Sequence, residues 1–502
     1  MIAALALALV AISLLTQAQG TIDLRDESYH WYGAIEVTRG KVPIRDFQAY
    51  DPGRYYWVAP WLALLGPGIV PFRIACSAFH FPGVLCGLLV LRRLTRSWSV
   101  LVPAGALLTV WLLPQYQPSH TVALVGVWLA VLLIEHPSSF RHLLAGVFIG
   151  LAAFFGRNLG VYALVSFGLV VGMVWWRLER RDLVRRVLAL GSGIVVGYSP
   201  MLVMFLLAPG LWTVNVYALR ALAESGRTNL ALPVPWPWRA SSLWEASVGV
   251  FFVLLPLFLA LSVAWVLRAK RDELLRSRVL VAATLVGFPY VHYAFSRADV
   301  QHLGMSIHPF LLGMLTLPFV VARRWRALAI GLVVGVGALS LVAAGQLNAL
   351  YQRAIAPPGR LVAAKVGGWT VWMPLPMATF IDGTARFNAS MVRPDEGFLI
   401  VPHIGPGMYA ILNRESPLWQ SYFLQPQPEW WQQPMIDELE RNHVDWVLLD
   451  DVRGDGHEEL RFRHTHRLIW EYIEREFDVF PVDGLPKDMV LLRRRTAPGA
   501  TP

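Results

Sequence analysis

A succession of long apolar runs limits what this chain can fold into more than any other feature. After an uncharged stretch at residues 1–22, runs close to the length of a bilayer crossing recur as far as residue 346. They lie at about 72–91, 98–114, 119–135, 142–156, 160–176, 187–208, 246–267, 279–294, 308–322 and 327–346. Because a backbone crosses lipid only with its hydrogen bonds made internally, such runs predict helices. With the first segment, they predict a polytopic α-helical membrane protein with about eleven transmembrane helices.

Composition excludes an ordinary soluble domain. Only 16% of the 502 residues are charged and 55% are hydrophobic, whereas soluble domains carry about a quarter charged residues.

Cys76 and Cys86 lie ten residues apart in one apolar run. A helix separates such positions by about 15 Å, too far for a disulfide.

The net charge of +10 is arranged as a topology signal. Arg and Lys gather in five loops, at 92–96, 140–142, 177–186, 268–278 and 323–326. All five lie on one side if 55–69 is a surface helix that does not cross. The positive-inside rule then places them and the N-terminus in the cytoplasm, and no nucleic-acid partner is expected. The outward segments are 20–56, 209–245, the turn 295–307 and everything after 346.

The residues after 346 differ in character from the apolar part. "GFLIVPHI", "VDWVLLDD" and "DMVLLRRR" predict strands, while "PMIDELERNH" and "RLIWEYIEREF" predict helices. Strand and helix patterns in alternation predict a small α/β domain, here extracytoplasmic. The predicted organisation is a transmembrane domain at 1–346, with outer loops 20–71 and 209–245, a linker at 347–370 and a soluble domain at 371–502.

The first outer loop concentrates acidic residues directly after an apolar helix. "RDESYHWYGAIEVTRGKVPIRDF" predicts a helix that Asp26 caps, that begins at Glu27 and that Gly40 ends. Neighbouring positions on a helix point in different directions, so Asp26 and Glu27 cannot both reach one reacting atom.

Two outward turns carry positive charge. "AFFGRNLGVYAL" places Arg157 and Asn158 between two apolar helices, where an Arg is costly unless it is paired, functional or reaching for lipid headgroups. "HYAFSRADVQHLGMSIHPF" gathers Arg297, Asp299 and His302, and a helical spacing puts Asp299 and His302 on one face. Both turns suit phosphate binding.

The loop motif resembles the first outer loop of membrane glycosyltransferases of the GT-C superfamily, which include protein O-mannosyltransferases and aminoarabinose transferases. The shared elements are the Asp26–Glu27 pair, Gly40, the run Pro43–Asp46 and Pro52–Gly53; Ile44 departs from the usual aromatic residue. The resemblance covers roughly residues 1–346. It implies transfer of a hexosyl or pentosyl group from a polyprenyl-phosphate donor to an acceptor hydroxyl, by an inverting mechanism at the outer face of the bacterial cytoplasmic (inner) membrane.

The resemblance also implies roles for particular residues. Such a transfer needs a base at the acceptor hydroxyl and positive charge or donors at the leaving phosphate. The implied set is Asp26 as general base, Glu27 and Asp46 for positioning the acceptor or a cation, Arg157, Asn158, Arg297 and His302 for lipid-phosphate binding, and Asp299 for orienting them.

Several alternatives stay open at the level of sequence. A transporter or flippase of envelope lipids or glycans also needs polar groups among helices, and the outward domain suits a non-catalytic scaffold of envelope assembly. The acceptor can be a glycan, a lipid or a protein, and membrane lipids are partners in every case. Whether the reaction needs a divalent cation is left open, and no organic cofactor is expected.

Overall fold

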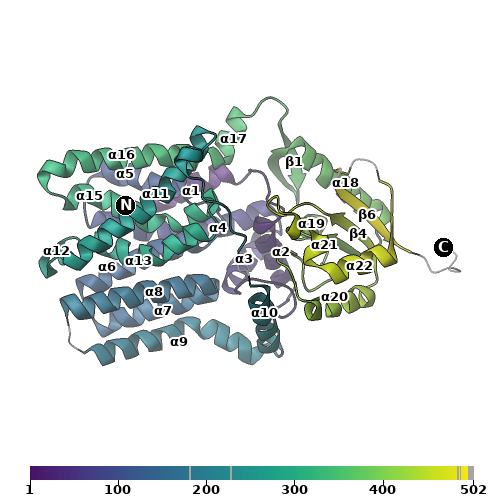
Figure 1. Ribbon diagram of the computed structural model, residues 1–502, viewed down its shortest axis with the longest axis horizontal. Coiled ribbons are helices and arrows are strands. Elements are labelled where there is room, and N and C mark those ends of the chain that lie inside the picture. The colour runs from purple at the N-terminus through teal and green to yellow at the C-terminus, as the bar shows by residue number, and fades with distance from the viewer. Residues whose placement is uncertain (180–181, 227–228, 483–484, 487, 496–502) are drawn as a thin grey trace. The chain divides into compact units, whose positions relative to one another are not determined.

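The structure, a computed structural model, describes residues 1–179, 182–226, 229–482, 485–486 and 488–495 (Figure 1). These residues form two compact units, each described here by itself. The first unit contains residues 1–18, 73–203 and 231–355, and the second contains 19–72, 204–230 and 356–502. The acidic loop that follows the first helix therefore belongs to the same compact unit as the C-terminal residues.

Helices make up the first unit. Its elements are α1 (Ile2–Gln17), α4 (Ile69–Arg92), α5 (Trp98–Val110), α6 (Ser119–Glu135), α7 (Ser139–Phe155), α8 (Arg157–Met173), α9 (Leu183–Leu207), α11 (Leu243–Arg268), α12 (Arg271–Arg276), α13 (Arg278–Ser296), α14 (Val300–Ser306), α15 (His308–Val320), α16 (Arg326–Ala343) and α17 (Ala349–Ile355), with short helical turns at Val174–Leu178, Pro237–Arg239, Arg323–Trp325 and Gly345–Leu347. The first residues of α4 (69–72) and the last residues of α9 (204–207) belong to the second unit.

Six helical segments of the described chain are long and apolar enough to cross a membrane. They are Ile69–Arg92, Arg157–Leu178, Leu183–Leu207, Leu243–Arg268, Arg278–Ser296 and Arg323–Leu347. A seventh is formed if α14 and α15, which bend by 60° at their break, count as one span. The chain is thus a multi-pass membrane protein, and four shorter apolar helices, α1, α5, α6 and α7, accompany these spans.

Glycines bring α7 and α9 into close contact. Gly146 and Gly150 on α7 face Gly193 and Gly197 on α9, and a Cβ atom at any of the four would overlap a backbone carbonyl oxygen of the other helix. Small residues four positions apart let helix backbones approach in lipid, where no hydrophobic effect drives helices together. The α7–α9 contact is therefore made by backbone atoms rather than by interlocking side chains.

The second unit combines helices with two sheets. Its elements are α2 (Asp26–Thr38), α3 (Gly53–Leu65), α10 (Leu211–Ser225), β1 (Leu361–Val366), β2 (Trp369–Pro374), α18 (Leu375–Met391), β3 (Gly397–Val401), α19 (Gly405–Leu412), α20 (Glu429–Arg441), β4 (Val444–Asp450), a turn at Glu458–Leu460, α21 (Phe462–Thr465), α22 (Arg467–Glu476), β5 (Phe477–Val479) and β6 (Met489–Arg494). The larger sheet has the order β3-β4-β6-β5, with β3 parallel to β4 and the other pairs antiparallel.

The three stretches predicted as strands form β3, β4 and β6, and the two predicted helices form α20 and α22. One face of the sheet packs on α20 and α22 around Leu399, Val447 and Ile469. The stretch 347–370, expected as a linker, contains α17, β1 and the start of β2. Gly367 and Gly368, both with positive φ, make the two-residue turn between β1 and β2.

Candidate active site

The acidic loop after the first helix is fixed by Asp23. Asp23 Oδ1 accepts a hydrogen bond from Arg25 N at 3.0 Å, and Oδ2 accepts one from Glu27 N at 3.4 Å. Glu27 Oε2 accepts in return from Asp23 N at 3.2 Å. The helix α2 begins at Asp26, one residue earlier than expected. The prediction that Asp26 is the cap is therefore wrong: Asp23 satisfies the first backbone N–H groups, and the Asp26 carboxylate is left for a different contact.

That contact is with a distant tyrosine. The Tyr422 hydroxyl donates a hydrogen bond to Asp26 Oδ1 at 2.9 Å. Asp26 is half-buried, whereas Tyr422 is only 6% exposed. Burial, followed by the negative charge of Asp26, raises the pKa of Tyr422 well above its ordinary value. The phenol therefore keeps its proton and remains a hydrogen-bond donor to the carboxylate.

Aromatic rings extend from this pair towards the surface. The rings of Tyr422 and Tyr29 have centroids 5.4 Å apart, and those of Tyr29 and Tyr50 are 4.9 Å apart. The Tyr50 ring is 40% exposed, and the Arg54 guanidinium lies 5.2 Å from its centroid. The Asp26 carboxylate is thus bordered by a row of rings that ends at solvent.

Two further acidic residues, Glu27 and Asp23, lie within three residues of Asp26. Glu27 is 7% exposed, and its carboxylate is turned back to Asp23 N, in accordance with the expectation that Asp26 and Glu27 point apart. Burial raises the pKa of Asp23 to about 6, and the charge of Asp26 acts in the same direction.

Asp46 is engaged by its own loop. Its Oδ1 and Oδ2 atoms accept hydrogen bonds from Arg45 Nε at 2.7 Å and Arg45 Nη2 at 2.8 Å, and Oδ2 also accepts one from Val42 N at 2.7 Å. The hydrogen bonds from Arg45 hold the pKa of Asp46 below its ordinary value. The arrangement closes the turn around Ile44, which has a positive φ of 73°. Positioning of an acceptor or cation by Asp46 stays a prediction.

Glu36 was not singled out from the sequence, although it is fully buried at 0% exposure. Arg39 Nη1 lies 2.5 Å from Glu36 Oε1, and Lys41 Nζ lies 2.6 Å from Glu36 Oε2. The i,i+3 spacing of Glu36 and Arg39 is a sequence signal for this pair. Lys41 also binds Glu415 at 2.5 Å, so the end of α2 is joined to a segment far along the chain.

In the first unit, the predicted turn is built around one carboxylate. Asp299 Oδ2 accepts from Arg297 Nε at 2.9 Å, and Oδ1 lies 3.0 Å from His302 Nδ1. Asp299 is also the N-cap of α14, because Oδ1 accepts from His302 N at 2.8 Å. The expected juxtaposition of Asp299 with Arg297 and His302 is confirmed. Phosphate binding by these side chains stays a prediction.

Arg157 and Asn158 begin α8, directly after Gly156, and both are exposed. A helix start presents unsatisfied backbone N–H groups, which favour negative charge.

The same unit contains three buried histidines whose rings adjoin: the His120 ring centroid lies 5.3 Å from that of His80 and 5.3 Å from that of His308. His308 Nε2 donates to Leu108 O at 3.1 Å, which is consistent with a structural role.

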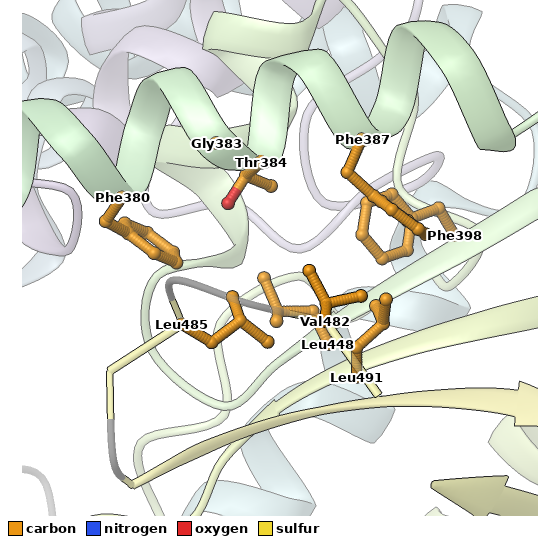
Figure 2. A pocket seen from close by; sticks show the side chains of 9 residues that line it. All are labelled: Phe380, Gly383, Thr384, Phe387, Phe398, Leu448, Val482, Leu485 and Leu491. Carbon is orange, nitrogen blue, oxygen red and sulfur yellow. The ribbon is translucent and has the colours of Figure 1, made fainter. Parts of the chain in front are cut away.

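The described residues hold no group of three His, Cys, Asp or Glu side chains arranged to bind a metal ion. A small pocket lies between α18 and the larger sheet (Figure 2). Its volume of about 40 Å³ is room for roughly three water molecules. Its lining residues are Phe380, Gly383, Thr384, Phe387, Phe398, Leu448, Val482, Leu485 and Leu491. No predicted site residue lines this pocket.

The predicted site residues fall into two sets by compact unit. Asp26, Glu27 and Asp46 belong to the second unit, and the first unit contains Arg157, Asn158, Arg297, Asp299 and His302. The structure brings together the members within the 297–302 turn, and it joins Asp26 to Tyr422. That the two sets serve one reaction stays a prediction.

Comparisons with known proteins bear on the fold. No family model matches the sequence, and no curated protein matches it. ArnT from Cupriavidus metallidurans bound to undecaprenyl phosphate is similar over 98% of this chain and 97% of that chain, with 14% identity and a TM-score of 0.52. ArnT in the apo state gives 13% identity and a TM-score of 0.50, over 98% of this chain and 96% of that one.

A third solved structure, an Archaeoglobus fulgidus oligosaccharyltransferase in complex with Zn and sulfate, is 10% identical with a TM-score of 0.48, over 91% of this chain and 70% of that one. The two ArnT matches are the stronger ones. At 13–14% identity they show a shared fold. They confirm the expected fold as far as its architecture, which this chain shares with ArnT.

Proposed function

We propose that this protein is a membrane glycosyltransferase that moves a hexosyl or pentosyl group from a polyprenyl-phosphate donor to an acceptor hydroxyl. The observation that carries the proposal is the Asp26 carboxylate at the start of α2, half-buried and with one oxygen held by Tyr422. The fold shared with ArnT adds support, because one of the ArnT structures contains undecaprenyl phosphate.

In the proposed reaction, Asp26 takes the proton of the acceptor hydroxyl as that oxygen attacks the anomeric carbon. The new C–O bond forms on the face opposite the phosphate, and the bond between the anomeric carbon and the phosphate oxygen breaks with its electron pair on the phosphate. The configuration is therefore inverted. General-base catalysis of this kind contributes about 10²–10⁴ in rate.

The leaving polyprenyl phosphate gains negative charge, and the basic set of the first unit is proposed to stabilise it. Arg297 and His302 are held by Asp299 at 2.9 and 3.0 Å, so their orientation is fixed before a ligand binds. Arg157 and Asn158, at the start of α8, supply further donors. Glu27 and Asp46 are proposed to position the acceptor, or a cation, beside the base.

We also propose the membrane arrangement that the reaction needs. The seven candidate spans and the four shorter apolar helices make eleven crossings, with the N-terminus in the cytoplasm. The catalytic loop and the α/β residues after 346 then face the periplasm or the exterior of a bacterial cytoplasmic membrane. A GT-C-like membrane domain at 1–346, a connecting segment at 347–370 and an outward domain at 371–502 remain the proposed functional division.

Transfer from radiolabelled polyprenyl-phosphate sugars by the purified protein tests the proposal. Asp26→Asn should lower the rate at least about 100-fold, whereas Asp437→Asn, the same change at an exposed carboxylate of α20, should leave it unchanged. An active Asp26→Asn protein would contradict the assigned base. Absence of transfer by the wild type from every such donor would favour a transporter or an assembly scaffold, and mass spectrometry of copurified lipids would name the donor.

A further inference from the structure

A segment without regular secondary structure runs along the acidic loop. We call residues 415–422 the strap. Most of its second half is buried in the second unit: Leu418, Gln420, Ser421 and Tyr422 are between 1% and 6% exposed. Between α19 and α20 the strap contains neither helix nor strand, so its position depends on the hydrogen bonds that it makes with other segments.

The strap makes hydrogen bonds with residues 26–48 of the first outer loop. Ser416 N donates to the Tyr32 hydroxyl at 2.8 Å, and Trp419 Nε1 donates to Ile44 O at 3.0 Å. Gln48 N donates to Trp419 O at 2.8 Å, and Gln48 Oε1 accepts from Tyr422 N at 2.9 Å. The Tyr422 hydroxyl donates to Asp26 Oδ1 at 2.9 Å. The strap thus follows α2 and the 42–48 turn, and its last residue reaches the carboxylate that we propose as the base.

We propose that Tyr422 is a positioning residue for this reaction: its hydroxyl holds Asp26 Oδ1, so that Oδ2 is presented to the acceptor hydroxyl. This inference rests on the proposed function of Asp26. It makes the C-terminal part of the chain a component of the catalytic site, since the donor lies 396 residues from its acceptor.

The chemistry of a neutral donor on a carboxylate explains the choice of tyrosine. A hydrogen bond to a charged group is stronger than one between neutral groups, and it stabilises the charged form. An ion pair with Lys or Arg would do this more strongly and would make the carboxylate a weaker base. A buried phenol restrains rotation of the carboxylate while leaving it able to accept a proton.

Other groups near the pair titrate or carry charge and bear on the test. Asp23 lies just before α2, Tyr29 within α2, Tyr50 in the loop, and His403 just after β3. Burial lowers the pKa of His403 to about 4, so it is neutral near pH 7. Asp23, with its pKa raised to about 6, titrates in the window of interest. The measurements are therefore made in an Asp23→Asn background as well as in the wild type.

The first experiment measures kcat and KM for sugar transfer against pH in Tyr422→Phe. The expected result is a kcat lower by about tenfold with a smaller change in KM, and an acid limb of the kcat profile displaced to higher pH. Tyr409→Phe is the matched control: that buried hydroxyl accepts from Ile400 N at 2.9 Å and donates to Phe398 O at 3.2 Å. Its removal should lower stability and leave the acid limb in place.

The second experiment replaces Tyr422 with 3,5-difluorotyrosine, which keeps the ring and the hydroxyl. A more acidic phenol is a stronger donor, so the acid limb should move to lower pH, opposite to Tyr422→Phe. This variant tests the inference even if Tyr422→Phe does not fold. Unchanged acid limbs in either folded variant, with Asp26→Asn inactive, would overturn the role of Tyr422 while leaving the proposed base intact. An active Asp26→Asn protein would overturn the proposed function instead.

Discussion

The turn 297–302 and the acidic loop around Asp26 are assembled in opposite ways. In the turn, one carboxylate, Asp299, binds Arg297 and His302 within six residues of chain. In the loop, Asp26 is held by Tyr422 across 396 residues. The difference teaches that a locally built cluster keeps its geometry from its own segment, whereas the geometry at Asp26 depends on how the C-terminal residues fold against the loop.

The largest loss of stability is expected when Glu36 is replaced. Glu36→Ala removes a fully buried carboxylate that binds Arg39 and Lys41. Arg39 then keeps its hydrogen bond to Asn413 and Lys41 its ion pair with Glu415, but both lose their buried partner at the end of α2. Breaking a buried ion pair from one side costs about 3 kcal/mol or more. Thermal unfolding of the purified variant in detergent should show a loss of stability of this size. Glu440→Ala, at an exposed position of α20, is the control. A loss equal to that of the control would mean that the loop is not held through Glu36.

Asp23 gives the next largest effect, and it depends on pH. Its pKa is raised to about 6 in the folded protein from an ordinary 3.8. The folded state then binds more protons than the unfolded state between these values, so stability is highest below pH 4 and falls as pH rises to about 6.

Asp23→Asn should remove this fall, which amounts to about 3 kcal/mol, when unfolding is followed between pH 4 and 8. Burial also raises the pKa of Asp450 to about 6, but Asp450 is present in both proteins and cancels in their difference. Parallel pH profiles for the wild type and the variant would contradict the raised pKa of Asp23.

Asp299→Ala tests the local cluster. It removes an N-cap of α14, which costs about 1 kcal/mol, and it releases Arg297 and His302. The stability change should be confined to this turn, as measured by hydrogen exchange of α14, and sugar transfer should fall through a higher KM for the donor. Protection changes that spread to the segments around Asp26 would show that the turn is not an independent, local structure.

Asp46→Asn should have the smallest effect. Arg45 and Asp46 are 31% and 29% exposed, and partly exposed ion pairs contribute about 0.5 kcal/mol. The pKa of Asp46 is lowered, so this contribution is present above the ordinary value of 3.8 and is lost as pH falls. Unfolding curves at pH 7 and pH 3 measure it. A loss of transfer much larger than the loss of stability would favour a direct role in acceptor positioning.

The sequence predicted what depends on nearby residues. Apolar runs located the helices, period-two patterns located β3, β4 and β6, and i,i+3 spacing linked Asp299 to His302. The β1–β2 hairpin was missed even though Gly367–Gly368 is a recognisable hairpin turn.

Two features had no sequence signal that could be used in this way. Asp23 and Asp26 are both acceptable caps, and the choice between them depends on backbone geometry. Tyr422 is one of 15 tyrosines, and its partnership with Asp26 follows from a tertiary contact with no spacing rule.

The glycine contact between α7 and α9 has a consequence for how this protein tolerates change. Only 17% of the apolar window of α9 is buried, so its attachment depends on Gly146, Gly150, Gly193 and Gly197. A backbone-to-backbone contact contains no ionisable group and little apolar side-chain area. This contact should therefore be insensitive to salt and acidity but intolerant of a single methyl group added at any of the four glycines.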